Sequence, residues 1–266
     1  MKLRIVVALA AASITLLTTG CAQAGNAPAA ETVTIKVAAT VTPMTDAVKA
    51  AAEVIGDGYK VQLVPVSDYV QPNVLLQQGE IDANLVQFSG FMDEFNQKND
   101  ATLVDVQPVY STVVAFYSKT LSSLQKLPDG GSVVIPNDKA NAARALQMLA
   151  DSRIIALDSQ VKRFAATLDD ITDNPRNLKF TQVDLLQLNT AYDEADAVFN
   201  LPSFARQLGL TPENDGLAVE QDPQFAVTLV SREDNADSPE IAALVKAMTS
   251  DHVRKTLESL GVPAAF

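Results

Sequence analysis

Strand-like and helix-like patterns alternate along the chain from residue 32 onward. The predicted strands are rich in β-branched residues and show either alternation or a short continuous apolar run; they cover residues 32–40, 60–66, 81–86, 103–106, 111–117, 132–136, 178–183, 195–199 and 225–230. The predicted helices place apolar residues three or four positions apart; they cover residues 45–55, 69–78, 141–149 and 185–194, with a closing helix from Pro239. This alternation favours an α/β fold in which helices flank parallel sheets.

The closing helix has the clearest start signal in the chain. Ser238 is a favourable N-cap, Pro239 suits the first helical position, and Glu240 places a negative charge in the first turn. Apolar residues then recur on one face, which predicts a helix packed against the core.

The strand–helix series starts twice, once near residue 32 and again near residue 132. Each series has the length of a common domain, so the pattern predicts two lobes rather than one sheet. Folds of this kind bind ligands beyond the carboxyl ends of their strands, and between the lobes where there are two. We therefore expect the functional site in a cleft between two lobes.

The first 20 residues are typical of a signal peptide. Lys2 and Arg4 precede an apolar run over residues 5–17, which is too short to span a bilayer. Small residues directly before Cys21 resemble a lipobox, which predicts a diacylated thiol at Cys21 as the mature N-terminus. The alternative is an ordinary secretory signal in which Cys21 is incidental. Residues 21–32 then form a tether between the membrane and the folded body.

Composition and charge narrow the classes of function. The chain has 266 residues, of which 47% are hydrophobic and 20% charged, as in ordinary globular proteins. A net charge of −12, with no basic stripe, argues against a nucleic-acid partner. One Cys and one His exclude a disulfide framework and a multi-histidine zinc site. We expect neither a metal nor another cofactor.

The sequence offers little catalytic chemistry. It has no Gly-rich phosphate-binding loop, and His252 is interpreted as a surface residue. Adjacent acidic residues occur as Asp93-Glu94, Asp169-Asp170 and Asp193-Glu194. Such pairs are more typical of a hydrated surface than of a glycosidase, so an exported hydrolase is the weakest hypothesis. We therefore expect a protein that is not an enzyme.

Arg144 is the best single candidate for a ligand anchor. It follows the strand at 132–136 and lies near the start of a helix, where a guanidinium can add a two-pronged carboxylate contact to the anion preference of the helix N-terminus. The alternative is an arginine on a hydrated first turn.

Six blocks together resemble the methionine-binding lipoprotein (NlpA/MetQ) family. They occur in the order of that family and cover most of the body; they are residues 67–73, 79–84, 93–96, 135–146, 174–180 and 195–200. The resemblance implies a type 2 periplasmic-binding-protein fold, with two crossovers near residues 111–117 and 225–230. It further implies one lobe from residues 33–112 and 226–266, and a second lobe from residues 113–225.

The resemblance also implies roles for individual residues. Arg144 would bind the ligand carboxylate, and Asn200 would hydrogen-bond the polar part of an amino acid. Tyr69 and Phe91 would contribute to an aromatic wall, and Asn141 would support the start of the helix.

The sequence departs from the family at the pocket. Phe88 stands where the family usually has histidine, Phe91 where it has tyrosine, and Val86 where it has an aromatic residue. Phe88 still offers apolar area, and aromatic rings suit a thioether. After Asn200 the family's Gly-Asn-Tyr is replaced by Leu201, Pro202 and Ser203.

The main hypothesis is therefore a lipid-anchored, monomeric receptor in the cell envelope. It would bind an L-amino acid, methionine or a related apolar one, and deliver it to the permease and ATPase of an ABC importer. A short peptide is an alternative ligand. A further alternative is an interaction protein that keeps the fold and has a degenerate pocket.

Overall fold

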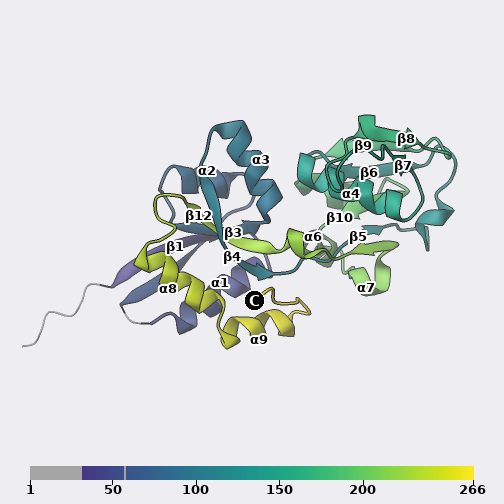
Figure 1. Cartoon of the computed structure of the whole chain (residues 1–266). Coiled ribbons are helices and arrows are strands. Elements are labelled where there is room, and N and C mark those ends of the chain that lie inside the picture. The colour runs from purple at the N-terminus through teal and green to yellow at the C-terminus, as the bar shows by residue number, and fades with distance from the viewer. Residues whose placement is uncertain (1–31, 57) are drawn as a thin grey trace, which may run out of the picture. The chain divides into compact units, whose positions relative to one another are not determined.

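The computed structural model describes residues 32–56 and 58–266, and within them the chain forms two five-stranded sheets (Figure 1). The predicted signal peptide and Cys21 lie outside the described residues. The strands of the first sheet, in spatial order, are β2 (Tyr59–Pro65), β1 (Val33–Ala39), β3 (Ala83–Gln87), β12 (Val227–Arg232) and β4 (Leu103–Tyr110). β1 is parallel to β2 and β3, whereas β12 is antiparallel to both β3 and β4.

The second sheet repeats this arrangement. Its strands, in spatial order, are β9 (Lys179–Val183), β6 (Ser132–Pro136), β10 (Ala197–Asn200), β5 (Val114–Tyr117) and β11 (Ala218–Glu220). β6 is parallel to β9 and β10, whereas β5 is antiparallel to β10 and β11. In both sheets the antiparallel strand is the fourth in order, and it is the strand that arrives from the other sheet.

Two segments carry the chain between the sheets. Residues 111–113 lead from β4 to β5, and residues 221–226 lead from β11 back to β12. The two crossings touch, because the Thr112 hydroxyl donates a hydrogen bond of 2.9 Å to the carbonyl oxygen of Phe225. The lobe boundaries expected from the resemblance, near residues 112 and 225, stay predictions.

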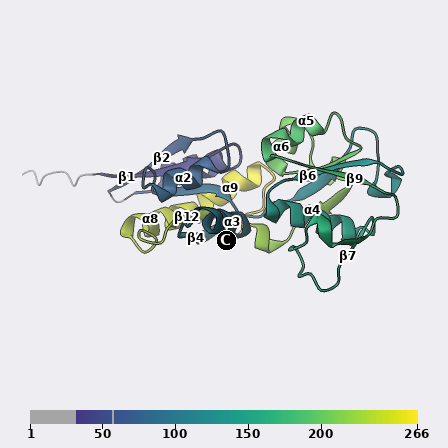
Figure 2. The same cartoon turned by 90° about the horizontal axis from the view of Figure 1, so that it is seen from above.

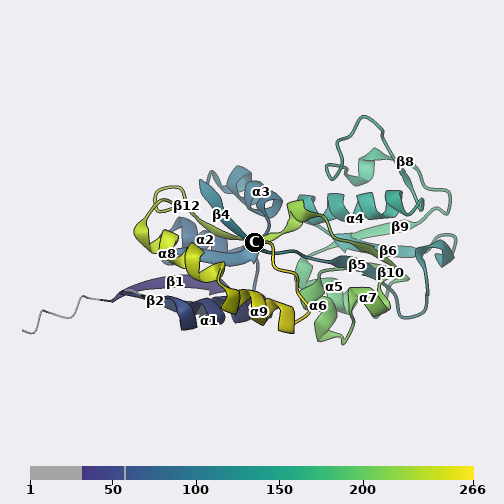
Figure 3. The same cartoon turned by 60° about the horizontal axis from the view of Figure 1, so that its bottom comes forward.

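Helices cover both faces of the first sheet (Figures 1 and 3). They are α1 (Met44–Val54), α2 (Gln71–Gln77), α3 (Ser89–Asn99), α8 (Pro239–Met248) and α9 (Asp251–Ser259). Alternate residues of β1 divide the core: Ile35 and Val37 pack with buried residues of α1, α8 and α9, whereas Ala38 packs with those of α2 and α3. Period-two alternation of side chains thus gives each face its own layer of helices.

The second sheet is covered in the same way (Figures 2 and 3). α4 (Lys139–Asp151) packs on Val133 and Ile135 of β6, whereas α5 (Leu188–Ala191) and α6 (Pro202–Gln207) contribute buried residues on the side of Val134. The remaining pieces are α7 (Pro212–Asp215), the pair β7 (Ala156–Leu157) and β8 (Ile171–Asp173), and four 3₁₀ turns, η1 (Leu124–Lys126), η2 (Leu168–Asp170), η3 (Leu185–Gln187) and η4 (Pro223–Phe225).

Several predicted elements have different limits in the structure. The apolar run 111–117 is not one strand: residues 111–113 cross between sheets, and only 114–117 form β5. Residues 185–194 were predicted as one helix but form η3 and the short α5. The closing helix begins as predicted, since the Ser238 hydroxyl accepts a 3.2 Å hydrogen bond from the amide of Ile241, and a second helix, α9, follows it.

Within the described residues, no helix is long and apolar enough to cross a membrane.

Candidate functional site

A cavity of about 40 Å³ lies where the two sheets approach each other. Residues on and beside strands of the first sheet line it from one side, and residues of the helices and turns that pack on the second sheet line it from the other. Its walls are mostly apolar and aromatic. Five of the six predicted ligand residues line this cavity, together with Val86: Tyr69, Phe88, Phe91, Asn141 and Arg144. The structure therefore brings together residues that are up to 75 positions apart in the sequence, from Tyr69 to Arg144.

The cavity is small because the two halves of the site touch. The Tyr69 and Ser203 hydroxyls are 3.3 Å apart, and the rings of Tyr69 and Phe204 meet edge to face with centroids 5.6 Å apart. A water molecule occupies roughly 30 Å³ of liquid volume, whereas ligand pockets usually measure at least about 300 Å³. In this conformation the cavity is therefore smaller than an ordinary ligand pocket.

A wider hollow of about 560 Å³ adjoins this cavity and shares Tyr69, Phe91 and Leu185 with it. Its rim carries the carboxylates of Asp68, Glu94, Asp138 and Asp184. Asp68 accepts hydrogen bonds from the amides of Val70 and Gln71, so this carboxylate is partly used to cap the chain before α2.

The start of α4 positions two of the predicted residues. Asp138 is the N-cap, and its carboxylate accepts hydrogen bonds from the Asn141 amide at 2.8 Å and from the Asn141 side chain at 3.1 Å. Burial raises the pKa of Asp138 to about 6, although the hydrogen bonds from Asn141 act in the opposite direction. The side-chain oxygen of Asn141 is buried and has no hydrogen-bond partner among the described residues. It is an available acceptor at the cavity wall.

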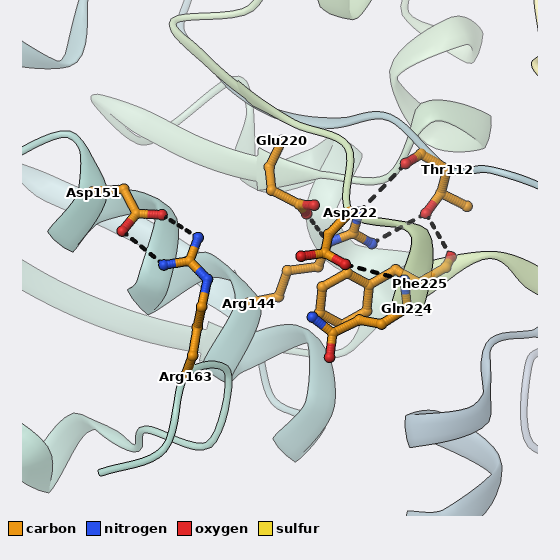
Figure 4. Close-up of polar contacts among 8 residues, drawn as sticks. All are labelled: Thr112, Arg144, Asp151, Arg163, Glu220, Asp222, Gln224 and Phe225. Carbon is orange, nitrogen blue, oxygen red and sulfur yellow. Dashed lines mark hydrogen bonds and ion pairs between the residues drawn. The ribbon is translucent and has the colours of Figure 1, made fainter. Parts of the chain in front are cut away.

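Arg144 is completely buried, so the alternative of an arginine on a hydrated turn is wrong. Its Nε donates to the Glu220 carboxylate, and its Nη1 donates to the Thr112 hydroxyl at 3.2 Å (Figure 4). The ring of Phe225 covers the guanidinium, with its centroid 4.0 Å from Cζ. Burial lowers the pKa of Arg144, while Glu220 acts in the opposite direction.

Two N–H groups of Arg144 stay available after these contacts. A guanidinium has five N–H groups, and Nη2 makes a further, long contact of 3.4 Å to the carbonyl oxygen of Thr112. One N–H on each Nη is therefore unassigned among the described contacts. Because Arg144 lines the cavity, these two groups are the donors that it retains for an acceptor there. The two-pronged carboxylate contact that the sequence predicts stays a prediction.

Asn200, the sixth predicted residue, lies at the end of β10 and does not line the cavity. Its side-chain nitrogen donates to Asn189 at 2.9 Å, and its side-chain oxygen accepts from the amide of Leu201 at 2.9 Å. In this conformation Asn200 shapes the turn from β10 into α6. Its predicted contact with a ligand stays a prediction.

Sequence reasoning missed Thr112, which lines the cavity, and Glu220 and Phe225, which contact Arg144 without lining the cavity. Glu220 is 76 positions from Arg144, and the other two lie on the crossing segments. No motif marks them, because their roles depend on the way both crossings pass beside α4. Gln87 was also missed; it lines the cavity and belongs to a buried amide network, in which Asn73 donates to Gln87 at 2.7 Å.

The other groups considered from the sequence lie elsewhere. His252 is exposed and forms a 2.7 Å contact with Glu53. A separate hollow of about 610 Å³ lies beside α4 and β7, and its lining residue Arg163 is paired with Asp151. No cluster of potential metal ligands occurs in residues 32–56 and 58–266.

Comparisons with known proteins agree with this architecture. The D-methionine-binding lipoprotein MetQ of Salmonella typhi is 38% identical over 200 residues, which cover 74% of this chain and 73% of that protein. The methionine-binding lipoprotein MetQ of Bacillus subtilis is 35% identical over 230 residues and 84% of each chain.

Among solved structures, a nutrient-binding protein from Burkholderia cenocepacia bound to methionine has a TM-score of 0.83 at 30% identity. That match covers 87% of this chain and all of the other. It confirms the expected α/β fold with two lobes. Residues 35–261 match the NlpA lipoprotein family, and the chain belongs to that family.

Proposed function

We propose that this protein is a lipid-anchored receptor that closes two lobes over an L-amino acid, methionine or a related apolar one. It would release this ligand to the permease and ATPase of an ABC importer. Lipidation of Cys21 would hold it at the membrane of the cell envelope, where it would act as a monomer and without enzymatic turnover.

One observation carries this proposal: a single completely buried arginine lines an otherwise largely apolar and aromatic cavity between the two sheets. An arginine in such a place suits a carboxylate, and the aromatic walls suit an apolar or thioether side chain. Relatives named for methionine binding, at 35–38% identity, support the same ligand class.

The proposed contacts follow from the geometry. Arg144 would bind the carboxylate, the free oxygen of Asn141 would accept a hydrogen bond from the ligand, and Tyr69, Phe88 and Phe91 would enclose the side chain. Ligand binding is then differential, because only the closed form offers contacts from both lobes at once.

Native mass spectrometry of the purified body, residues 22–266, tests the proposal. A bound mass equal to methionine, released on denaturation, is the expected result. Another amino acid or a short peptide would show that Val86 and Phe88 have changed the specificity. An empty protein whose thermal unfolding is unaffected by any common amino acid would contradict the transport function.

That last outcome would favour the interaction protein. The observation behind this second candidate is the cavity itself, which at about 40 Å³ is far smaller than an amino acid requires. A protein that stays closed in the presence of every amino acid would act through its surface.

A further inference from the structure

We propose that Glu220 makes this site selective for an amino acid whose amino and carboxyl groups are both free, over the same molecule without its amino group. The inference rests on the proposed function and deepens it, because it assigns a specificity-determining role to a residue outside the family motifs quoted above.

The geometry of the pair supports this role. Glu220 ends β11 and pairs with Nε of Arg144, and their side chains are 11% and 0% exposed. Both residues belong to elements of the second sheet and its helices, so opening of the lobes leaves the pair intact. Phe225 covers the guanidinium and adds a desolvated face to the pair (Figure 4).

The charge of Glu220 is compensated mainly by Arg144. Its second carboxylate oxygen is buried and makes no hydrogen bond to any described residue. The other nearby charges, Asp222 and Arg163, are more accessible to water: Asp222 is half-buried, and the Arg163 side chain is 55% exposed and paired with Asp151. Arg144 and Glu220 therefore balance each other, and the half-buried Asp138 carboxylate beside Asn141 adds a further negative charge to the site.

A ligand adds its own charge to this balanced pair. A zwitterionic amino acid adds no net charge to this pair, whereas the same molecule without its amino group adds one negative charge that nothing in the dry cavity compensates. Uncompensated buried charges are costly, so the pair discriminates against the deaminated molecule. Removal of the Glu220 charge leaves the positive charge of Arg144 without its partner, so that a ligand with only a carboxylate can compensate it.

The test compares two ligands on four proteins by isothermal titration calorimetry. The ligands are L-methionine and 4-(methylsulfanyl)butanoate, which is methionine without its amino group. The proteins are the wild type, Glu220→Gln, Glu220→Asp and, as a control with the same change of charge, Glu194→Gln, which lies exposed in the same half of the chain. Gln can still accept the hydrogen bond from Arg144, so this variant changes charge rather than shape.

We expect the affinity ratio of methionine to its deaminated analogue to fall at least about tenfold in Glu220→Gln. Glu220→Asp and Glu194→Gln should keep the wild-type ratio, and thermal unfolding should show that all four proteins fold. An unchanged ratio in Glu220→Gln, with methionine still bound by the wild type, would overturn this inference alone. Failure of the wild type to bind either ligand would overturn both this inference and the proposed function.

Discussion

Arg144 shows how a single side chain serves stability and binding together. Its guanidinium is buried, and it is held by Glu220, Thr112 and the ring of Phe225. Its position in the sequence indicates an anion contact near the start of a helix, and this contact stays a prediction. The pairing of Arg144 with Glu220 could not be predicted, because Glu220 comes close to Arg144 only when β11 pairs with β5.

Replacement of Arg144 by alanine should abolish methionine binding and also destabilise the protein. The Glu220 carboxylate would then be buried without its partner, and breaking a buried pair on one side costs roughly 3–5 kcal/mol. Urea denaturation would measure this loss. The double variant Arg144→Ala/Glu220→Ala should be more stable than the single one, and equal stability would show that the pair is not coupled.

At the scale of elements, capping residues and strand alternation predicted the structure well where short-range interactions determine it. Ser238 and Pro239 define the start of α8, and strand alternation located most strands of both sheets. The signals failed where tertiary structure decides. Residues 111–117 are largely apolar, yet residues 111–113 cross between the sheets. The periodicity does not predict α3, because this helix has few apolar positions and buries only Met92 and Phe95.

The N-cap of α4 gives the protein a pH-dependent term in its stability. The pKa of Asp138 is raised from 3.8 to about 6 by burial, so the folded state binds a proton more tightly than the unfolded state. The contribution is fully present below about pH 3.8 and is lost as the pH rises through about 6.

The Asp138→Asn variant should lose this term. Between pH 4 and 6.5 its free energy of unfolding should fall less steeply with pH than that of the wild type, by up to roughly 3 kcal/mol in total. Urea titrations at several pH values would show it. Parallel curves for the two proteins would mean that Asp138 ionises normally in the folded state.

The contribution of the Ser238 cap to the free energy of unfolding should not depend on pH between 4 and 6.5. Ser238→Ala removes the acceptor for the Ile241 amide and should cost about 1 kcal/mol of unfolding free energy. Denaturation of this variant also serves as a control for Asp138→Asn, because Ser238 lies in the helical layer of the first sheet and Asp138 in that of the second. A loss well above this value would show that Ser238 does more than cap the helix.

At the scale of the whole molecule, the two-lobe architecture was predictable, but the size of the cavity was not. Periodicity indicates which faces are buried, whereas the distance between two lobes depends on contacts such as that of Tyr69 with Ser203. Those contacts hold the described conformation nearly closed around the site. Ligand entry therefore competes with contacts that the protein makes with itself.

Removal of one such contact should accelerate ligand association. Ser203→Ala deletes the partner of the Tyr69 hydroxyl, and a hydrogen bond of about 0.5–1.5 kcal/mol corresponds to a two- to tenfold larger open population. Stopped-flow fluorescence or another rapid-mixing readout would give the association rate. Ser122→Ala, at an exposed position of the same half, is the control. Equal rates in both variants would show that this hydrogen bond does not limit opening.

The exchange of strands between the two sheets also has a consequence for the order in which the chain can fold. β4 is joined to its sheet only through β12, which lies more than a hundred residues later in the sequence. A chain that emerges from its amino end must therefore leave β4 unpaired until residues 227–232 have appeared. The carboxyl-terminal part of the chain thus completes the first lobe. A chain whose synthesis or export stops before residues 227–232 would leave a sheet edge of this lobe unpaired.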